Sequence, residues 1–235
     1  ARVIPSAPLP NGWRGKTWAC HQGGHAAKGK WLLFLDADVA LQPNALGQIL
    51  AACRAGGGAV SVLPFHRTVR WLEDLSAFFN LVQAAASNVF TIRGTRAGHK
   101  RFFGPVLAVL KEDFVRAGGY EPVKDRWVEN FDLSDHFQKC GIPIACFGGK
   151  GAVDFRMYAG GVGEIGRGWG KSFAMGGKGT PISIWVGWSL WLAGAMGTTR
   201  ALLSALFLWD TVAFLWAALS YALFVTQIYQ WLRRI

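Results

Sequence analysis

The stretch WLLFLDADV, residues 31–39, decides how the rest of the chain is interpreted. Its first five residues are all apolar, which is typical of a short buried β-strand. Two carboxylates follow, Asp36 and Asp38, at a spacing that points both to one side. Such a pair can hold Mg²⁺ or Mn²⁺, because hard cations prefer oxygen ligands and share them with phosphate groups. The stretch therefore predicts a strand that ends in two carboxylates, which are either exposed acids or a site for a metal ion and a diphosphate.

Helix and strand patterns alternate on both sides of this strand. Strands are predicted at 58–64, 102–110 and 142–147, and helices at 70–90, 111–118 and 128–141. A further helix is predicted over 16–30, where small residues suit close packing on a sheet: Ala19, Gly23, Ala26 and Ala27. This alternation predicts an α/β fold, a sheet with helices on its faces. Binding sites in such sheets open at the carboxyl ends of strands, where Asp36 and Asp38 fall.

Lys16 lies in a Gly-Lys-Thr sequence that could end a phosphate-binding loop. Such a loop needs a glycine five positions earlier, but that position is Pro10, which has no N–H to offer a phosphate. The preceding segment is also a proline-punctuated coil and not a buried strand. A phosphate-binding loop is therefore disfavoured, and Lys16 is left to face a phosphate from a helix start or to face solvent.

Charge and cysteine content limit the classes of partner. The chain has 25 Lys and Arg against 14 Asp and Glu, a formal net charge of +11. These basic residues are scattered and no nucleic-acid-binding module occurs, so anionic lipid or a phosphorylated substrate is favoured over nucleic acid. The cysteines show neither a CxxC pair nor a metal-ligand spacing, which indicates free thiols: Cys20, Cys53, Cys140 and Cys146.

Two apolar runs near the C-terminus predict a membrane anchor. Residues 182–199 carry no charge, and residues 201–232 carry only Asp210. Positive residues flank the pair of runs, and only Arg200 lies between them. The positive-inside rule then predicts a transmembrane hairpin with both flanks in the cytoplasm, its second run continuing along the membrane surface. A buried helical hairpin of a soluble protein is the alternative.

Three blocks, in the same order, resemble family 2 glycosyltransferases with the GT-A fold. Residues 15–39 resemble the family's Gly-Lys-x-x-Ala…Leu-Asp-Ala-Asp block, and residues 102–141 resemble its acceptor-side segment with a Gly-Gly-aromatic turn and an acidic helix. Residues 155–177 resemble the segment before the membrane region in transferases that act on carotenoid acids (4,4'-diaponeurosporenoate) and hopanoids. The resemblance covers residues 8–180.

This resemblance implies a GT-A-like mixed sheet flanked by helices and incomplete at the N-terminus, since the family's first strands and helix have no counterpart here. Residues 1–180 would be the C-terminal two-thirds of the catalytic domain, and residues 181–235 the transmembrane region. The implied protein is a multi-pass protein of the cell membrane whose catalytic domain faces the cytoplasm. It would move a sugar from a nucleotide-diphosphate sugar, with a UDP-sugar expected, to a lipophilic acceptor, using Mg²⁺ or Mn²⁺ on Asp36 and Asp38.

The same resemblance implies roles for four other donor-side residues. Lys16 would begin a helix beside the nucleotide. Arg167, Trp169 and Lys171 are similar to the end of the family's diphosphate motif, where Arg167 would meet phosphate and Trp169 would stack on a sugar or acceptor. Anchoring at the membrane surface explains these three residues nearly as well.

The catalytic base is the point at which this sequence departs from the family. Asn130 stands where the family has the aspartate that acts as general base, and an amide cannot accept a proton. Glu129 and Asp132 flank it, and Asp132 is the preferred substitute; both also suit a helix N-terminus without any catalytic role. A carboxylic acid acceptor would ionise unaided.

Two other functions stay open. A non-catalytic, membrane-anchored sugar- or nucleotide-binding relic is favoured by Asn130. A haloacid-dehalogenase-type phosphatase would use Asp36 as nucleophile, but the Gly-Asp dipeptide of its metal motif does not occur in this chain.

Overall fold

The computed structural model describes residues 2–70, 73, 74, 76, 80, 84, 101–158, 160–176 and 182–234, without the side chains of 171–176, 184 and 232–234. The chain divides into two compact units, Ala1–Lys178 and Gly179–Arg234. Most of the helix predicted over 70–90 lies outside the described residues; the five that are described are helical.

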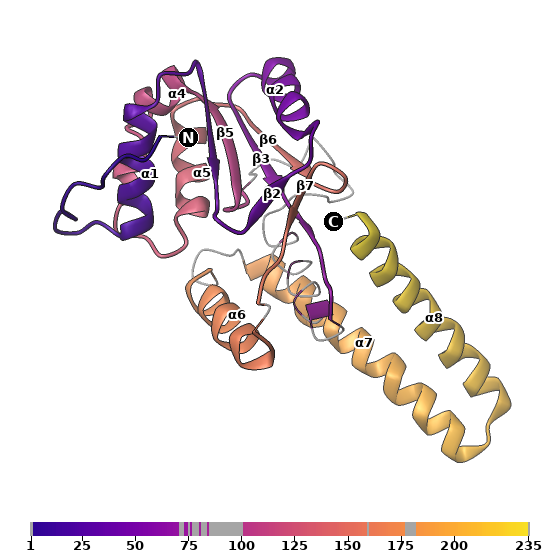
Figure 1. Cartoon of the computed structure of the whole chain (residues 1–235). Coiled ribbons are helices and arrows are strands. Elements are labelled where there is room, and N and C mark those ends of the chain that lie inside the picture. The colour runs from indigo at the N-terminus through magenta and orange to yellow at the C-terminus, as the bar shows by residue number, and fades with distance from the viewer. Residues whose placement is uncertain are drawn as a thin grey trace. The chain divides into compact units, whose positions relative to one another are not determined.

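A four-stranded mixed sheet forms the centre of the first unit (Figure 1). Its strands are β1 (Trp31–Leu35), β5 (Val106–Leu110), β3 (Ala59–Leu63) and β6 (Ile144–Gly148), in that spatial order. β5 runs antiparallel to both β1 and β3, whereas β3 and β6 are parallel. All four strands overlap the stretches that predicted them, which confirms the mixed α/β fold.

A second sheet, which the sequence did not predict, joins three short strands. β2 (Val39–Leu41) pairs antiparallel with β7 (Val153–Phe155), and β7 pairs parallel with β4 (Phe65–His66). β2 begins directly after Asp38, so this sheet fixes the chain on the far side of the two aspartates.

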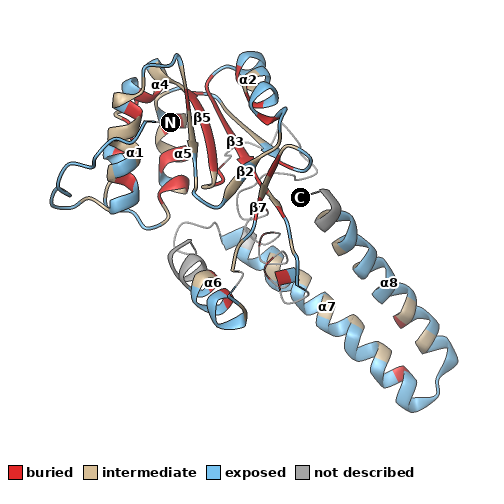
Figure 2. Cartoon of the chain, viewed as in Figure 1, coloured by how far each residue is buried: buried red, intermediate tan, exposed pale blue. Residues whose placement is uncertain are grey.

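Helices cover both faces of the central sheet. On one face lie α1 (Gly15–Ala26), α4 (Lys111–Arg116) and α5 (Glu129–Lys139), with the short 3₁₀ turn η2 (Glu121–Val123), and α2 (Ala45–Gly56) lies on the other (Figure 1). Alternate strand residues supply the two cores: Leu107 and Val109 of β5 pack with the α5 side, and Val106 and Ala108 pack with α2. Figure 2 shows this as buried strands between partly buried helices.

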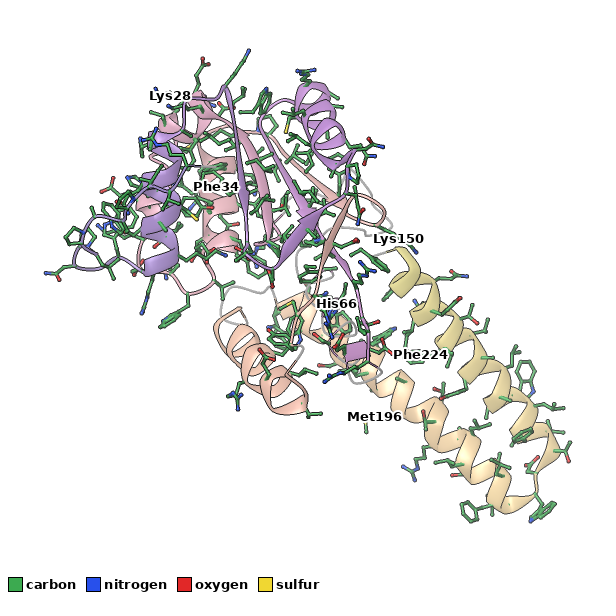
Figure 3. All side chains as sticks on the ribbon, in the orientation of Figure 1. Lys28, Phe34, His66, Lys150, Met196 and Phe224 are labelled. Carbon is green, nitrogen blue, oxygen red and sulfur yellow. The ribbon has the colours of Figure 1, made fainter. Side chains whose placement is uncertain are left out.

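Helix α1 packs on this face through a different residue than the sequence predicted. Gly24 is buried, whereas Ala19 is exposed. A Cβ atom at Gly24 would lie 2.6 Å from the Phe114 ring, so only glycine allows this approach. Phe34 of β1 points toward the same helices (Figure 3), with its ring centroid 5.4 Å from those of Phe114 and Tyr120.

Ser61 is the one polar residue of β3, and it is fully buried. Its Oγ accepts a hydrogen bond from the N–H of Phe103 at 2.8 Å and lies 2.9 Å from the carbonyl oxygen of the same residue. The carbonyl oxygen of Val106 is 3.1 Å away. The hydroxyl therefore ties the segment that enters β5 to the middle of the sheet.

The second unit is a pair of long helices, α7 (Ile182–Leu208) and α8 (Thr211–Arg234). Apolar windows of 24 and 21 residues within them are long enough to cross a membrane, and only 6% of each is buried. Buried helices of a soluble protein would be mostly covered, so the two helices fit a membrane anchor. Trp191 of α7 contacts α8, with its ring centroid 4.9 Å from that of Phe224 and 6.1 Å from that of Trp231.

The break between these helices differs from the predicted one. α7 continues through Arg200, and the turn comes at Trp209 and Asp210. Trp209 takes a φ of 54°, and the Asp210 carboxylate accepts a hydrogen bond from the N–H of Ala213 at 3.0 Å. Asp210 thus caps the start of α8. The second helix thus begins at Thr211 and not at residue 201 as expected, and both helices are long enough to span a membrane.

Candidate functional site

Lys16 joins the two acidic motifs of the sequence at one point. It lies in the first turn of α1, and its Nζ is 2.9 Å from Oδ1 of Asp36, which follows β1. The same Nζ is 3.0 Å from Oε1 of Glu129, the first residue of α5. Three segments that are distant in sequence therefore meet at one ammonium group.

The charge of Lys16 is held firmly by this arrangement. Burial works against the ammonium, but the carboxylates of Glu129 and Asp36 outweigh burial and raise the pKa of Lys16. The Lys16 side chain is 45% exposed, whereas that of Glu129 is only 8% exposed. Lys16 is therefore a permanent cation that faces solvent on one side and two carboxylates on the other.

The Cys20 thiol and the Tyr120 hydroxyl adjoin the cluster of Lys16, Asp36 and Glu129 (the Lys16 cluster), and the sequence did not identify either as a site residue. Burial raises the pKa of the Cys20 thiol, and burial together with the nearby thiol and carboxylates raises the pKa of Tyr120. Both groups stay protonated, so neither offers an ionised nucleophile. Cys20 lies one helical turn after Lys16, a signal that the sequence did contain.

Asp36 and Asp38 occupy the turn between β1 and β2. The N–H of Asp36 donates to the carbonyl oxygen of Pro105 at 2.9 Å, which fixes the end of β1 beside the start of β5. Loss of solvent, with the Asp36 carboxylate nearby, raises the pKa of Asp38. Within the part of the chain that the structure describes, no group of three or more His, Cys, Asp or Glu side chains is placed to hold a metal ion. A cation here would take ligands from these two carboxylates and from the substrate.

The three candidates for the base have different surroundings. Asn130 is buried, and its Nδ2 donates a 2.7 Å hydrogen bond to the carbonyl oxygen of Phe102. Glu129 is paired with Lys16, as described above. Asp132 is 49% exposed and pairs with Arg126 at 3.3 Å. The structure thus brings Glu129, and not Asp132, to the Lys16–Asp36 pair.

The segment before α5 is fastened to α1. The carbonyl oxygen of Lys124 accepts hydrogen bonds from the N–H of Arg14 and the hydroxyl of Thr17, both at 2.8 Å. The Arg14 guanidinium lies over the ring of Trp127, 3.8 Å from its centroid, and Trp127 is 50% exposed. These contacts hold the start of α5 in place relative to Lys16.

Helix α6 (Val162–Gly176) carries the remaining predicted residues. Arg167 is exposed, and the side chain of Lys171 lies outside the described residues. Trp169 is 3% exposed, and its indole N–H donates to the hydroxyl of Ser76 at 2.9 Å. The ring of Trp169 is therefore packed inside the fold.

Comparisons with known proteins find glycosyltransferases among the relatives of this chain. A model of glycosyl transferase family 2 matches residues 7–115. The chain is 34% identical over 201 residues to the 4,4'-diaponeurosporenoate glycosyltransferase of Staphylococcus haemolyticus (strain JCSC1435), covering 84% of this chain and 54% of that protein. It is 33% identical over 193 residues to the enzyme of the same name from Staphylococcus aureus (strain USA300), covering 81% and 52%.

The chain thus spans about half the length of these curated relatives. The matched region contains Lys16 and the Asp36–Asp38 turn, and nothing in these matches supports the phosphatase alternative. The chain therefore carries a glycosyl transferase family 2 domain over residues 7–115.

Proposed function

We propose that this chain is part of a membrane-bound inverting glycosyltransferase that moves a sugar from a nucleotide-diphosphate sugar to a lipophilic acceptor of the carotenoid-acid or lipid type. The observation that carries the proposal is the meeting of Asp36, Lys16 and Glu129, because it joins the donor-side motif to the acceptor-side helix. The names of the two relatives support the acceptor class. A UDP-sugar is the proposed donor.

On the donor side, Asp36 and Asp38 are the proposed ligands of Mg²⁺ or Mn²⁺. Two partly accessible carboxylates on one turn fit this role, since such ions commonly complete their shell with substrate phosphates. A metal ion there supplies Lewis-acid stabilisation of the departing diphosphate. Lys16, and on α6 Arg167 and Lys171, are proposed to add positive charge for the donor phosphates. Trp169 is proposed to fix α6 through Ser76 and not to stack on the sugar, because its ring is buried.

On the acceptor side, Glu129, Asn130 and Asp132 flank the point of attack. An acceptor oxygen would approach the anomeric carbon from the side opposite the diphosphate, which gives single displacement with inversion. Glu129 is favoured over Asp132 as the functional carboxylate on the acceptor side, because Glu129 contacts Lys16 whereas Asp132 forms an ion pair with Arg126. Glu129 would hold Lys16 in position beside the donor motif.

The proposed domains follow the sequence: residues 1–180 belong to the catalytic domain and residues 181–235 to a transmembrane hairpin of a multi-pass cell-membrane protein. The turn at Trp209–Asp210 contains neither Lys nor Arg, while Lys178 precedes α7 and α8 ends with Arg233 and Arg234. The positive-inside rule then orients both flanks, and the catalytic domain with them, to the cytoplasm. An anchor of this kind tethers the enzyme to the membrane in which a lipophilic acceptor dissolves.

Metal-dependent nucleotide binding tests the proposal. In the full-length protein, Asp36→Asn and Asp38→Asn are expected to abolish Mn²⁺-dependent binding of UDP, measured by calorimetry, without loss of fold. Asp113→Asn is the matched control, because Asp113 pairs with Arg116 on α4. Unchanged metal-dependent affinity in both variants would refute the donor site.

A binding relic is the second candidate function, and Asn130 is the observation that favours it. A relic would bind the nucleotide sugar but release no nucleoside diphosphate. Release of UDP from a UDP-sugar by the wild-type protein would show that it is an enzyme and not a binding relic.

A further inference from the structure

Arg200 is the single charged residue of α7, and it lies well inside the helix. The 27 residues of α7 measure about 40 Å, longer than the apolar core of a bilayer, which is about 30 Å thick. Arg200 precedes the last residue, Leu208, by about 12 Å, or about 9 Å of depth once the helix tilts to fit. An arginine at that depth is unfavourable unless it meets an anion or water.

Helix α8 lies on the other side of α7 from Arg200. The less exposed residues of α7 recur every three or four positions and mark the side that faces α8: Trp188, Trp191, Ala195, Thr198, Leu202 and Ala205. Arg200 is two positions from both Thr198 and Leu202, which turns it to the opposite side of a helix with 3.6 residues per turn. Met196, one turn earlier, points away from α8 (Figure 3). Arg200 therefore faces outward from the hairpin.

The hairpin itself offers no anion at this place. Its one acidic residue is Asp210, which lies beyond the end of α7 and caps α8. Among the residues that the structure describes, neither the Arg200 guanidinium nor the Ser204 hydroxyl has a hydrogen-bond or ion-pair partner. The Thr199 hydroxyl, by contrast, donates to the carbonyl oxygen of Ala195 at 2.9 Å. Arg200 and Ser204, one turn apart, are thus two donors without an acceptor.

An open groove of about 700 Å³ runs along this side of α7. Arg200 and Ser204 lie in its middle, and exposed apolar side chains adjoin them, including Met196, Leu203 and Phe207. A cation and a hydroxyl among apolar side chains match an amphiphile that has an anionic head and a hydrocarbon chain. Guanidinium groups bind phosphate through two parallel N–H···O bonds.

We propose that the outward groove of α7 binds an anionic phospholipid, whose phosphate is held by Arg200 and Ser204. The acyl chains would lie along Leu203 and Phe207 or Met196. The lipid comes from the leaflet that holds the turn at Trp209–Asp210, because the arginine side chain extends toward the headgroups and the bilayer thins locally around it. The inference rests on the proposed transmembrane hairpin and is independent of the transferase activity.

Charge complementarity favours this occupant over a second copy and over a zwitterionic lipid. A second copy in the same orientation presents its Asp210 at the level of the turn, and not at the depth of Arg200. The ammonium of a zwitterionic lipid would find no carboxylate in the groove and would be repelled by Arg200. An anionic phospholipid satisfies both donors and brings no second cation.

Dioleoylphosphatidylglycerol and dioleoylphosphatidylcholine form a matched pair of probes, because they share their chains and phosphate and differ in net charge. Native mass spectrometry of the full-length protein in detergent measures the dissociation constant of the first lipid bound. The wild type is expected to bind phosphatidylglycerol at least about tenfold more tightly than phosphatidylcholine. Arg200→Leu and Arg200→Gln are expected to weaken the binding of phosphatidylglycerol by on the order of ten- to a hundredfold, and Ser204→Ala by about two- to tenfold.

Two control variants are expected to keep the wild-type preference. Ser220→Ala removes a serine hydroxyl of α8 that donates to the carbonyl oxygen of Trp216. Arg54→Leu removes one positive charge from the exposed end of α2, outside the hairpin. Should Arg200→Leu fail to fold, Arg200→Gln and Ser204→Ala give the same readout.

Three results would overturn the inference. The wild type binds the two lipids equally, or both Arg200 variants lose no more affinity for phosphatidylglycerol than Arg54→Leu does. In the third, the Arg200 variants keep the lipid affinity but unfold at a lower temperature without added lipid, which would show that a carboxylate of another protein segment holds Arg200. A full-length protein that stays in solution without detergent would instead refute the transmembrane hairpin itself.

Discussion

Replacing Lys16 with methionine is expected to destabilise the protein in a way that depends on pH. The substitution keeps the length and much of the apolar stem of the side chain but removes the ammonium between Asp36 and Glu129. Two carboxylates are then left facing each other without a cation. Their repulsion, and not a loss of packing, is the expected cause of the change.

The structure sets the scale of that repulsion. The two ion-pair distances, 2.9 and 3.0 Å, limit the separation of the carboxylate oxygens to about 5.9 Å. Two unit charges at that distance repel by about 0.7 kcal/mol in water and about 2.8 kcal/mol at an effective permittivity of 20. Lys16 is 45% exposed and Asp36 33% exposed, so solvent screening favours the lower part of this range. A loss of about 1–2 kcal/mol in unfolding free energy is expected, which lowers the Tm of a protein of this size by roughly 2–8 °C.

Thermal unfolding of the full-length protein in detergent, at pH 4 and pH 8, measures this effect. Crowded carboxylates bind a proton more readily when folded than when unfolded, so the loss is expected to be small at pH 4 and to grow as the pH rises toward 6. Lys28→Met is the control, because Lys28 is exposed beyond the end of α1 (Figure 3). Repulsion between Asp36 and Glu129 would be refuted if Lys16→Met lowers the unfolding free energy no more than Lys28→Met does, or if its effect is the same at both pH values.

Two further predictions concern the membrane hairpin and the ion pair between Arg156 and the buried Glu73. A reporter inserted at Asp210 is expected to label the non-cytoplasmic side and one fused to the C-terminus the cytoplasm, and equal labels would contradict the hairpin. Elsewhere, the Arg156 guanidinium at 2.6 Å and the N–H of Val69 lower the pKa of Glu73 to about 2. The stability lost in Arg156→Met is therefore expected to be constant above pH 4.5 and to vanish as the pH falls toward 2, as measured by thermal unfolding; a loss that persists at pH 2 would contradict this.

The central sheet was predictable because its strands are continuous apolar runs. β3 and β5 are buried on both faces, and such runs stand out in the sequence without knowledge of their partners. The strands of the second sheet have only two or three residues, too few to show any period. Their pairing depends on contacts between residues 89 to 116 positions apart, as for Phe65 with Asp154 and Val39 with Phe155. Those contacts exist only once the chain has folded.

The site divides in the same way. The Asp36–Asp38 pair could be identified as a candidate because both residues lie on one turn. The link from Lys16 to Glu129 could not, because no local pattern reports an ion pair across the sheet face. Preference for Asp132 rested on helical spacing, which does not reveal that Arg126 lies beside it. In the hairpin, Arg200 suggested a boundary, whereas the signal that ends α7 is Asp210, a helix-capping residue followed by a renewed apolar run.

The position of Asn130 in the site depends on Ser61, a residue in the interior of the central sheet. Its hydroxyl holds Phe103, and the neighbouring carbonyl of Phe102 holds Asn130. Valine at position 61 would match the other apolar residues of β3. It would, however, leave the Phe103 N–H buried without an acceptor and loosen the backbone segment to which Asn130 is hydrogen-bonded. Which side chain is accepted at position 130 therefore depends on the residue at position 61. Among relatives of this chain, positions 61 and 130 are therefore expected to covary.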